Sequence, residues 1–164
     1  MDPITVGRLT IKDKTGCTFE IGTCSAADLS CLTEMYRDFS PRPASQGLPP
    51  EDAGSCKAWI EELIGIGENV LAWRSEKVIG HAALIPDVKG DSGEFVVFVH
   101  QNYRNLGVGT QLTRLILKRA RELGFNSVWL TVAITNFIAI KLYVKLGFQY
   151  CDMDACERKM MIKL

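Results

Sequence analysis

The sequence predicts an α/β (α+β) domain, in which a mixed central sheet of about six to seven strands is flanked by about four helices. Two observations lead to this prediction. Strand-like and helix-like runs alternate in the second half of the 164 residues, and strand-like runs separated by tight turns occur elsewhere. Alternation favours parallel neighbours and tight turns favour antiparallel ones. One mixed sheet with helices on both faces accommodates both.

Length and charge narrow the class of protein further. Nineteen basic residues balance nineteen acidic ones, and 47% of the chain is hydrophobic. At about 150 residues per domain we expect a single domain over 1–164, and zero net charge argues against a nucleic-acid partner. The longest apolar run, Phe95–Val99, is five residues against the roughly 20 that a membrane helix needs, and no secretory signal opens the chain. We expect a cytoplasmic protein with no membrane partner.

The six cysteines do not suggest a metal site or a disulfide framework. They form no C-x-x-C pair, and only two histidines accompany them. Without an export signal, we expect free thiols packed as small hydrophobic side chains, and no metal.

The first third of the chain combines short strands with two helices. Residues 4–24 resemble one or two strands around the turn Asp13–Gly16, which makes 1–16 an N-terminal strand extension. Ser25, followed three residues later by Asp28, is a helix N-cap signal. The expected elements are a helix from Ser25 to about Phe39, an irregular loop at 40–50 with four prolines, and a helix from about Glu51 with Ala58, Trp59, Leu63 and Ile66 near one face.

The middle of the chain shows strand patterns and then a long helix. A tight turn at Ser75–Lys77 joins the first two strands, and the helix beginning at Gly107 has apolar residues at 3.6-residue spacing up to the stop at Gly124. The expected strands are Asn69–Arg74, Val78–Ile85 and Glu94–Val99.

The last forty residues complete the sheet. Ser127–Ala133 is a strand candidate, and Asn136 caps a helix that runs to Leu146 before Gly147. Two closing strands are expected near Phe148–Asp152 and Glu157–Leu164.

The segment Glu94–Thr110 carries the strongest chemical signal. An apolar strand leads into Arg104-x-x-Gly107-x-Gly109, which opens a helix. The first turn of a helix offers unpaired N–H groups and a positive dipole end, and glycines allow an anion to approach the backbone. Arg104 adds a positive charge. These residues alone leave a tight structural turn and a phosphate site both open.

A second constellation follows about thirty residues later. Asn136 and Tyr143 are seven residues apart, so they lie on the same side of one helix. Taken alone, they are an N-cap and a core aromatic residue.

Together, the two constellations resemble the GNAT superfamily of acetyl-CoA-dependent N-acyltransferases. The resemblance covers about residues 17–164 and is strongest in the expected cofactor-binding core, 94–148. It implies that the loop grips the CoA pyrophosphate, that the preceding strand binds the pantetheine arm and that Tyr143 lies by the CoA sulfur. The implied cofactor-binding residues are Val97, Phe98, Val99, Arg104, Asn105, Leu106, Gly107, Val108, Gly109, Thr110 and Asn136.

The general base is less well defined by the resemblance. Ribosomal-protein acetyltransferases of this family carry a glutamate where this chain has Thr131. Glu94-Phe95 instead resembles the arrangement in bacterial Pat-type protein lysine acetyltransferases, which makes Glu94 the candidate base and Tyr143 the candidate proton donor to the thiolate. His100 is an alternative base, although a loop or cofactor-rim histidine fits it better. A backbone N–H near Val99 would hold the oxyanion.

The resemblance implies direct acetyl transfer from acetyl-CoA to a primary amine, preferably a protein lysine or an N-terminal amine. A small-molecule amine is the nearest alternative, and a non-catalytic acyl-CoA-binding regulatory module is the rival class. A homodimer is a further candidate assembly. We expect the loop at 40–50 to shape the acceptor pocket, His81 to be a hydrogen-bonded core residue, and the solvated face of the long helix to hold Arg114, Lys118, Arg119 and Arg121.

Overall fold

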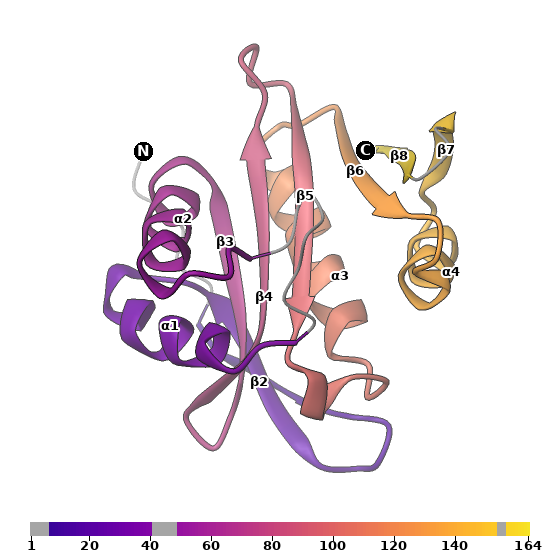
Figure 1. Ribbon diagram of the computed structural model, residues 1–164. Helices are drawn as coiled ribbons and strands as arrows, with labels where there is room; N and C mark the ends of the chain where they lie inside the picture. Colours follow the sequence, from indigo (N-terminus) through magenta and orange to yellow (C-terminus); the bar gives the residue numbers. More distant parts are fainter. Residues whose placement is uncertain (1–6, 41–48, 154–156) are drawn as a thin grey trace.

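The computed structural model describes residues 7–40, 49–153 and 157–164, and within them eight strands form one sheet in the order β1-β2-β3-β4-β5-β6-β8-β7 (Figure 1). The strands are β1 (Leu9–Lys12), β2 (Thr18–Thr23), β3 (Glu68–Arg74), β4 (Lys77–Pro86), β5 (Ser92–Val99), β6 (Ser127–Ala133), β7 (Gln149–Met153) and β8 (Glu157–Lys163). The helices are α1 (Leu29–Arg37), α2 (Ala53–Ile66), α3 (Val108–Glu122) and α4 (Phe137–Lys145), with short 3-10 turns η1 (Ala26–Asp28) and η2 (Gln101–Tyr103). The predicted mixed fold is confirmed.

Local signals explain the N-terminal half of the sheet, in which β1 to β5 pair antiparallel in chain order. The predicted turn at Asp13–Gly16 joins β1 to β2, with Gly16 in the left-handed conformation that its φ of 89° requires. Ser75 and Glu76 both have positive φ in the two-residue turn between β3 and β4. Such a turn matches the twist of the strands, and it confirms the tight turn predicted at Ser75–Lys77.

Two hydrophobic clusters cover opposite faces of the sheet. Helices α1 and α2 pack on one face, against β3 and β4, while α3 and the Tyr143 face of α4 pack on the other (Figure 1). The expected face of α2 is partly wrong, because Ala58 and Ile66 are exposed. The buried residues of this helix are Cys56, Ile60 and Leu63, with Trp59 partly buried. The small thiol of Cys56 occupies a core position that the pattern did not assign.

A hydrogen-bonded chain of polar side chains crosses the α1/α2 core. The Nε2 atom of His81 lies 2.8 Å from Oδ1 of Asn69, and the Tyr36 hydroxyl lies 2.8 Å from Nδ1 of His81. Asn69 uses its amide nitrogen to donate to Leu63 O, so its oxygen accepts from His81 and Nδ1 of His81 accepts from Tyr36. Burial lowers the pKa of His81 to about 3, which keeps the ring neutral. The prediction of a core histidine is confirmed.

One expectation about an individual side chain needs correction. Arg119, assigned to the solvated face of α3, is 2% exposed and donates to Glu68 at 2.7 Å and to Glu122 at 2.9 Å. A buried guanidinium needs such partners, and Glu68 at the start of β3 lies far away in sequence. Arg114, Lys118 and Arg121 are exposed, as expected.

The five described cysteines are free thiols, and three of them pack in or against the core, as expected. Cys56 is buried, and Cys24 and Cys31 are partly buried against the same cluster. Cys17 and Cys151 are exposed, and Cys156 lies outside the described residues. No helix in the described part of the chain is long and apolar enough to cross a membrane.

Candidate active site

The sheet opens between β5 and β6, and this opening defines the candidate site (Figure 1). The two strands pair in parallel only from Ser92–Ser127 to Glu94–Trp129, whereas β5 continues its pairing with β4 up to Val99–Gly80. Beyond Glu94, no strand of the described residues pairs with the second edge of β5. A stretch of exposed strand edge therefore lies inside the sheet rather than at its border.

The register shows which backbone groups face this opening. His100 N–H donates to Ile79 O, so Phe98 and Val96 are the next hydrogen-bonded partners of β4. The N–H and C=O groups of the intervening residues, Val97 and Val99, consequently point toward β6. Val97 and Val99 therefore stay the predicted partners of the pantetheine arm. The amide and carbonyl of Phe98 are hydrogen-bonded within the sheet, and its side chain packs in the α1/α2 core.

The loop after β5 leads directly into the N-terminus of α3. Gly107 is the N-cap residue, with a φ of 96°, and Asn105 also has a positive φ of 63°. Helix geometry leaves the N–H groups of the first turn without intrahelical acceptors, and they include those of Val108, Gly109 and Thr110. This turn is the predicted phosphate site, and it begins where the open edge of β5 ends.

Gly109 lies where three elements meet. A Cβ atom built on it would be 3.5 Å from Cγ2 of Val99 in β5 and 3.7 Å from Cδ2 of Leu142 in α4. The first turn of α3 therefore faces both the end of the open strand and the helix that carries Tyr143. Absence of a side chain at Gly109 leaves this junction free.

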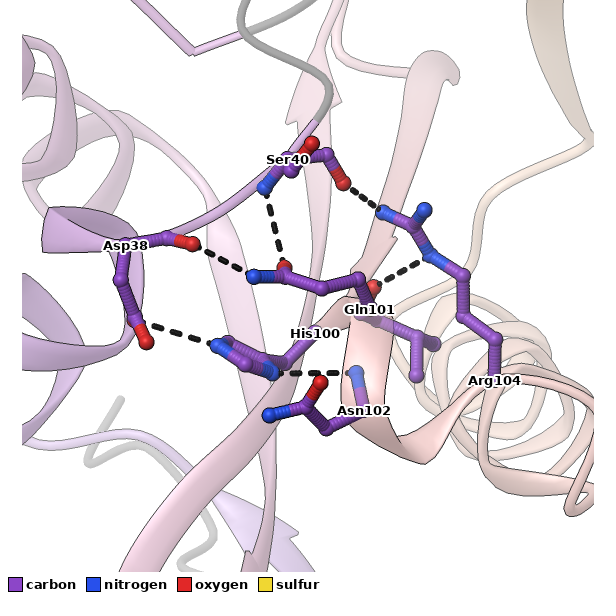
Figure 2. Close-up of polar contacts among 7 residues, drawn as sticks. Asp38, Ser40, His100, Gln101, Asn102 and Arg104 are labelled. Carbon is purple, nitrogen blue, oxygen red and sulfur yellow. Dashed lines mark hydrogen bonds and ion pairs between the residues drawn. The ribbon is translucent and has the colours of Figure 1, made fainter.

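Arg104 does not direct its charge at the α3 N-terminus. Its Nε donates to Val99 O at 2.9 Å and its Nη2 donates to Ser40 O (Figure 2). The guanidinium also lies over the ring of Phe39. Burial lowers its pKa. Arg104 joins the end of β5 to the segment after α1, so the positive charge expected at the phosphate loop is used in a structural contact.

His100 and Gln101 reinforce the same junction (Figure 2). Gln101 accepts from Ser40 N–H at 2.9 Å and donates to Asp38 O at 2.6 Å. His100 accepts from Asn102 N–H through Nδ1, so its Nε2 donates to Asp38, 3.1 Å away. Both ring nitrogens are engaged in a loop contact, which favours the structural interpretation of His100 over the role of base. In the loop at 40–50, which is expected to shape an acceptor pocket, residues 41–48 lie outside the described residues.

Tyr143 combines a buried ring with an accessible hydroxyl. The ring packs against Phe95 and Phe148, and the residue is 7% exposed. Among the described residues, every fully buried polar side-chain atom has a hydrogen-bond partner. The Tyr143 hydroxyl has no such partner in this part of the chain, so it is not fully buried and reaches the surface. Burial raises its pKa well above 10, which keeps the group protonated as a donor. Through Phe95, Tyr143 borders the open part of β5.

Glu94 lies at the point where β5 and β6 separate. It pairs with Ile85 on one side and Trp129 on the other, and the unbroken register of β5 places it on the same face as Val96 and Phe98. The pKa of Glu94 is raised, first by burial and then by the nearby Asp87 carboxylate, while Lys159 opposes this shift. A carboxylate with a raised pKa is a stronger base near neutral pH.

Residues that sequence reasoning missed surround Glu94. The Trp129 indole N–H donates to Asp87 at 3.2 Å, Ser92 donates its hydroxyl to Asp87, and Lys159 Nζ lies 4.5 Å from the Trp129 ring centre. These residues come from β5, β6, β8 and the β4–β5 connection. No local pattern could have found this cluster, because only the folded sheet brings it together.

Asn136 acts as a helix cap. Its Oδ1 accepts from Ala139 N–H at 3.2 Å, as the N-cap interpretation predicted. A cofactor contact by the same side chain stays a prediction.

Comparisons with known proteins agree with this geometry. The chain is 32% identical over 138 residues to "N-acetyltransferase family 8 member 2" of Rattus norvegicus, an alignment that covers 81% of this chain and 50% of that protein. This chain spans about half the length of the curated relatives it matches, the rat protein among them. The sequence identity to the rat protein therefore refers only to the aligned 138 residues.

Solved structures share the fold. The GNAT domain of S. lividans PAT superposes with a TM-score of 0.78 at 16% identity, covering 96% of this chain and 97% of that one. The PaiA N-acetyltransferase of Thermoplasma acidophilum, solved in complex with coenzyme A, has a TM-score of 0.69 at 20% identity, covering 90% and 100%. The family model of the acetyltransferase (GNAT) family matches residues 31–148, which include the open strand, the phosphate loop and Tyr143. The chain therefore belongs to the GNAT acetyltransferase family.

Proposed function

We propose that this protein is an N-acetyltransferase that transfers the acetyl group of acetyl-CoA to a primary amine. The observation that carries the proposal is the continuity of the site. An open strand edge begins beside Glu94, passes the Tyr143 helix and ends at the α3 N-terminus, so one extended thioester ligand could contact all three.

The open edge and the helix turn fit the two polar parts of acetyl-CoA. The N–H and C=O groups of Val97 and the N–H group of Val99 face the opening and suit the amides of a pantetheine arm, while Val99 O accepts from Arg104. The N–H groups from Val108 to Thr110 suit the pyrophosphate, because a helix N-terminus stabilises anions. When bound, acetyl-CoA supplies an acetyl group activated as a thioester. An N–H near Val99 would stabilise negative charge on the acetyl oxygen.

Glu94 is proposed to accept the proton of the amine, directly or through a water molecule. A lysine amine has a pKa of about 10.4, so roughly one molecule in 2,500 is neutral at pH 7, and removing its proton costs nearly 5 kcal/mol. The raised pKa of Glu94 brings this carboxylate closer to the pH at which a general base works best. Its position at the separation of β5 and β6 is on the face opposite the Phe95 and Tyr143 side chains.

Tyr143 is proposed to protonate the departing thiolate. Its hydroxyl reaches the surface beside the open strand, and the burial that raises its pKa ensures that it carries a proton to donate. Glu94 and Tyr143 would thus act on opposite sides of one transfer, with β5 between them.

The acceptor is proposed to be a protein lysine or an N-terminal amine. The carboxylates of Glu94 and Asp87 lie near one another and outnumber the nearby ammonium of Lys159, which suits a positively charged group approaching from solvent. A small amine would present the same charge, so it is the second candidate. A panel of peptides, polyamines, amino acids and aminoglycosides, scored by mass spectrometry, separates the two.

The decisive experiment measures transfer and binding together. Glu94→Gln should lower kcat by roughly 10²–10⁴ with little change in acetyl-CoA affinity, and Tyr143→Phe should lower kcat without removing the acidic limb of the pH profile. Glu61→Gln and Tyr150→Phe change the same groups at exposed positions and serve as matched controls. CoA binding with no turnover on any amine, together with a silent Tyr143→Phe, would instead favour a non-catalytic acyl-CoA-binding module.

A further inference from the structure

A second segment of the chain touches the phosphate loop from outside the region that the family model matches. The turn between β1 and β2 packs against this loop, and the Lys14 N–H donates to Leu106 O at 3.0 Å. In Figure 1 the indigo hairpin curls beneath the start of α3. The family model matches residues 31–148, so Lys14 lies outside the matched residues.

The turn is held rigidly where it meets the loop. Asp13 is 8% exposed and accepts from the N–H and hydroxyl of Thr15 and from Cys17 N–H. It also forms an ion pair with Arg74, whose guanidinium lies 5.6 Å from the ring centre of Tyr103 in η2. The bonds from Thr15, with Arg74, lower the pKa of Asp13 to about 2. Lys14 therefore projects from a fixed point.

The Lys14 side chain lies beside the phosphate loop. Its Cγ is 4.0 Å from the position that a Cβ on Gly107 would occupy. Lys14 is exposed, and no salt bridge engages its ammonium within the part of the chain that the structure describes. By contrast, the charge of Arg104 is committed to Val99 and to Ser40.

We propose that Lys14 binds a phosphate group of CoA and supplies the positive charge that Arg104 does not direct at this site. The inference rests on the proposed function, because it requires CoA at the α3 N-terminus. A lysine ammonium is a compact point charge that suits phosphate, and the rigid β1–β2 turn limits the entropy lost when it binds. The ligand group is either the pyrophosphate or the 3′-phosphate.

Calorimetry with CoA and dephospho-CoA tests the proposal on the full chain. Lys14→Met should weaken CoA binding about tenfold and reduce its dependence on salt, while Lys14→Arg should retain most of the affinity. Lys12→Met removes a charge from the same exposed hairpin and should leave the affinity unchanged. If the loss caused by Lys14→Met disappears with dephospho-CoA, the partner is the 3′-phosphate; if it persists, the partner is the pyrophosphate.

Equal affinity of wild type and Lys14→Met for both ligands would overturn the inference. Equal losses in Lys12→Met and Lys14→Met would also overturn it, because they would indicate general attraction by a charged hairpin. Failure of the wild type itself to bind CoA would overturn the proposed function, and with it this inference. Thermal unfolding of each variant separates a loss of contact from a loss of folded protein.

Discussion

A methyl group added at Gly109 should stabilise the protein and weaken CoA binding at the same time. Gly109 lies in the first turn of α3 without a positive φ, and an added Cβ would meet Val99 and Leu142 at 3.5 and 3.7 Å. These are ordinary van der Waals distances, so Gly109→Ala fits. Glycine costs up to ~1 kcal/mol relative to alanine in a helix, which corresponds to a gain of about 2–4 °C in Tm for a domain of this size.

The same methyl group would occupy the space through which the pyrophosphate must approach the helix N–H groups. A charge-assisted hydrogen bond is worth roughly 1.5–3 kcal/mol, so loss of one should weaken CoA binding tenfold or more. Gly109→Val should be more severe. Calorimetry gives the affinity, and a thermal melt of the same sample without ligand gives the stability.

Two glycines provide the matched controls. Gly65, near the end of α2, has open space around its Cβ position, so Gly65→Ala should raise the Tm without changing the affinity. Gly107 has a φ of 96°, so Gly107→Ala should lower the Tm because alanine is strained there. A Gly109→Ala protein that is more stable and binds CoA as tightly as wild type would refute the placement of the pyrophosphate at this turn.

Three further predictions concern stability and pH. Tyr36→Phe should destabilise the protein by about 1–3 kcal/mol in a denaturant titration, because it leaves Nδ1 of the buried His81 without a donor; a change within 0.5 kcal/mol would contradict this network. The pKa of Asp13 is about 2 in the folded protein against an ordinary 3.8, so the stability that its carboxylate contributes is present above about pH 4 and is lost as the pH falls toward 2. The difference in free energy of unfolding between wild type and Asp13→Asn should therefore shrink over this range. A constant difference would refute the assignment. Asp87→Asn should move the acidic limb of kcat/KM to lower pH, because one of the influences that raise the pKa of Glu94 is removed; an unmoved limb would separate Glu94 from that limb.

Much of the fold could be predicted because its signals are local. The turn at Asp13–Gly16, the α3 limits set by Gly107 and Gly124, and the α4 cap at Asn136 each depend on a few adjacent residues. The sheet was expected to hold about six to seven strands, and the described residues contain eight, because the range 4–24 forms two strands. Local chemistry was sufficient for these elements.

The missed features depend on contacts between distant segments. The buried Arg119 pairs with Glu68, which is 51 residues away in sequence, and Arg104 donates to Ser40, which is 64 residues away. Likewise, Asp87 acts on Glu94 from the β4–β5 connection and Lys159 acts on it from β8. The type of a side chain and its spacing from neighbouring residues in the sequence predict which groups it can bind. The tertiary fold determines which of these groups lies within reach.

One interruption of the sheet accounts for both halves of the proposed chemistry. Pairing between β5 and β6 ends at Glu94–Trp129, and from that point the alternate backbone groups of β5 on this edge become available to a ligand. The last paired residue is therefore the candidate base, and the first open stretch is the candidate thioester platform. Because side chains alternate along the strand, Glu94 lies on one face while Phe95, which contacts Tyr143, lies on the other. Two substrates could thus approach β5 from opposite faces and meet at its edge, which is the geometry that direct transfer between them requires.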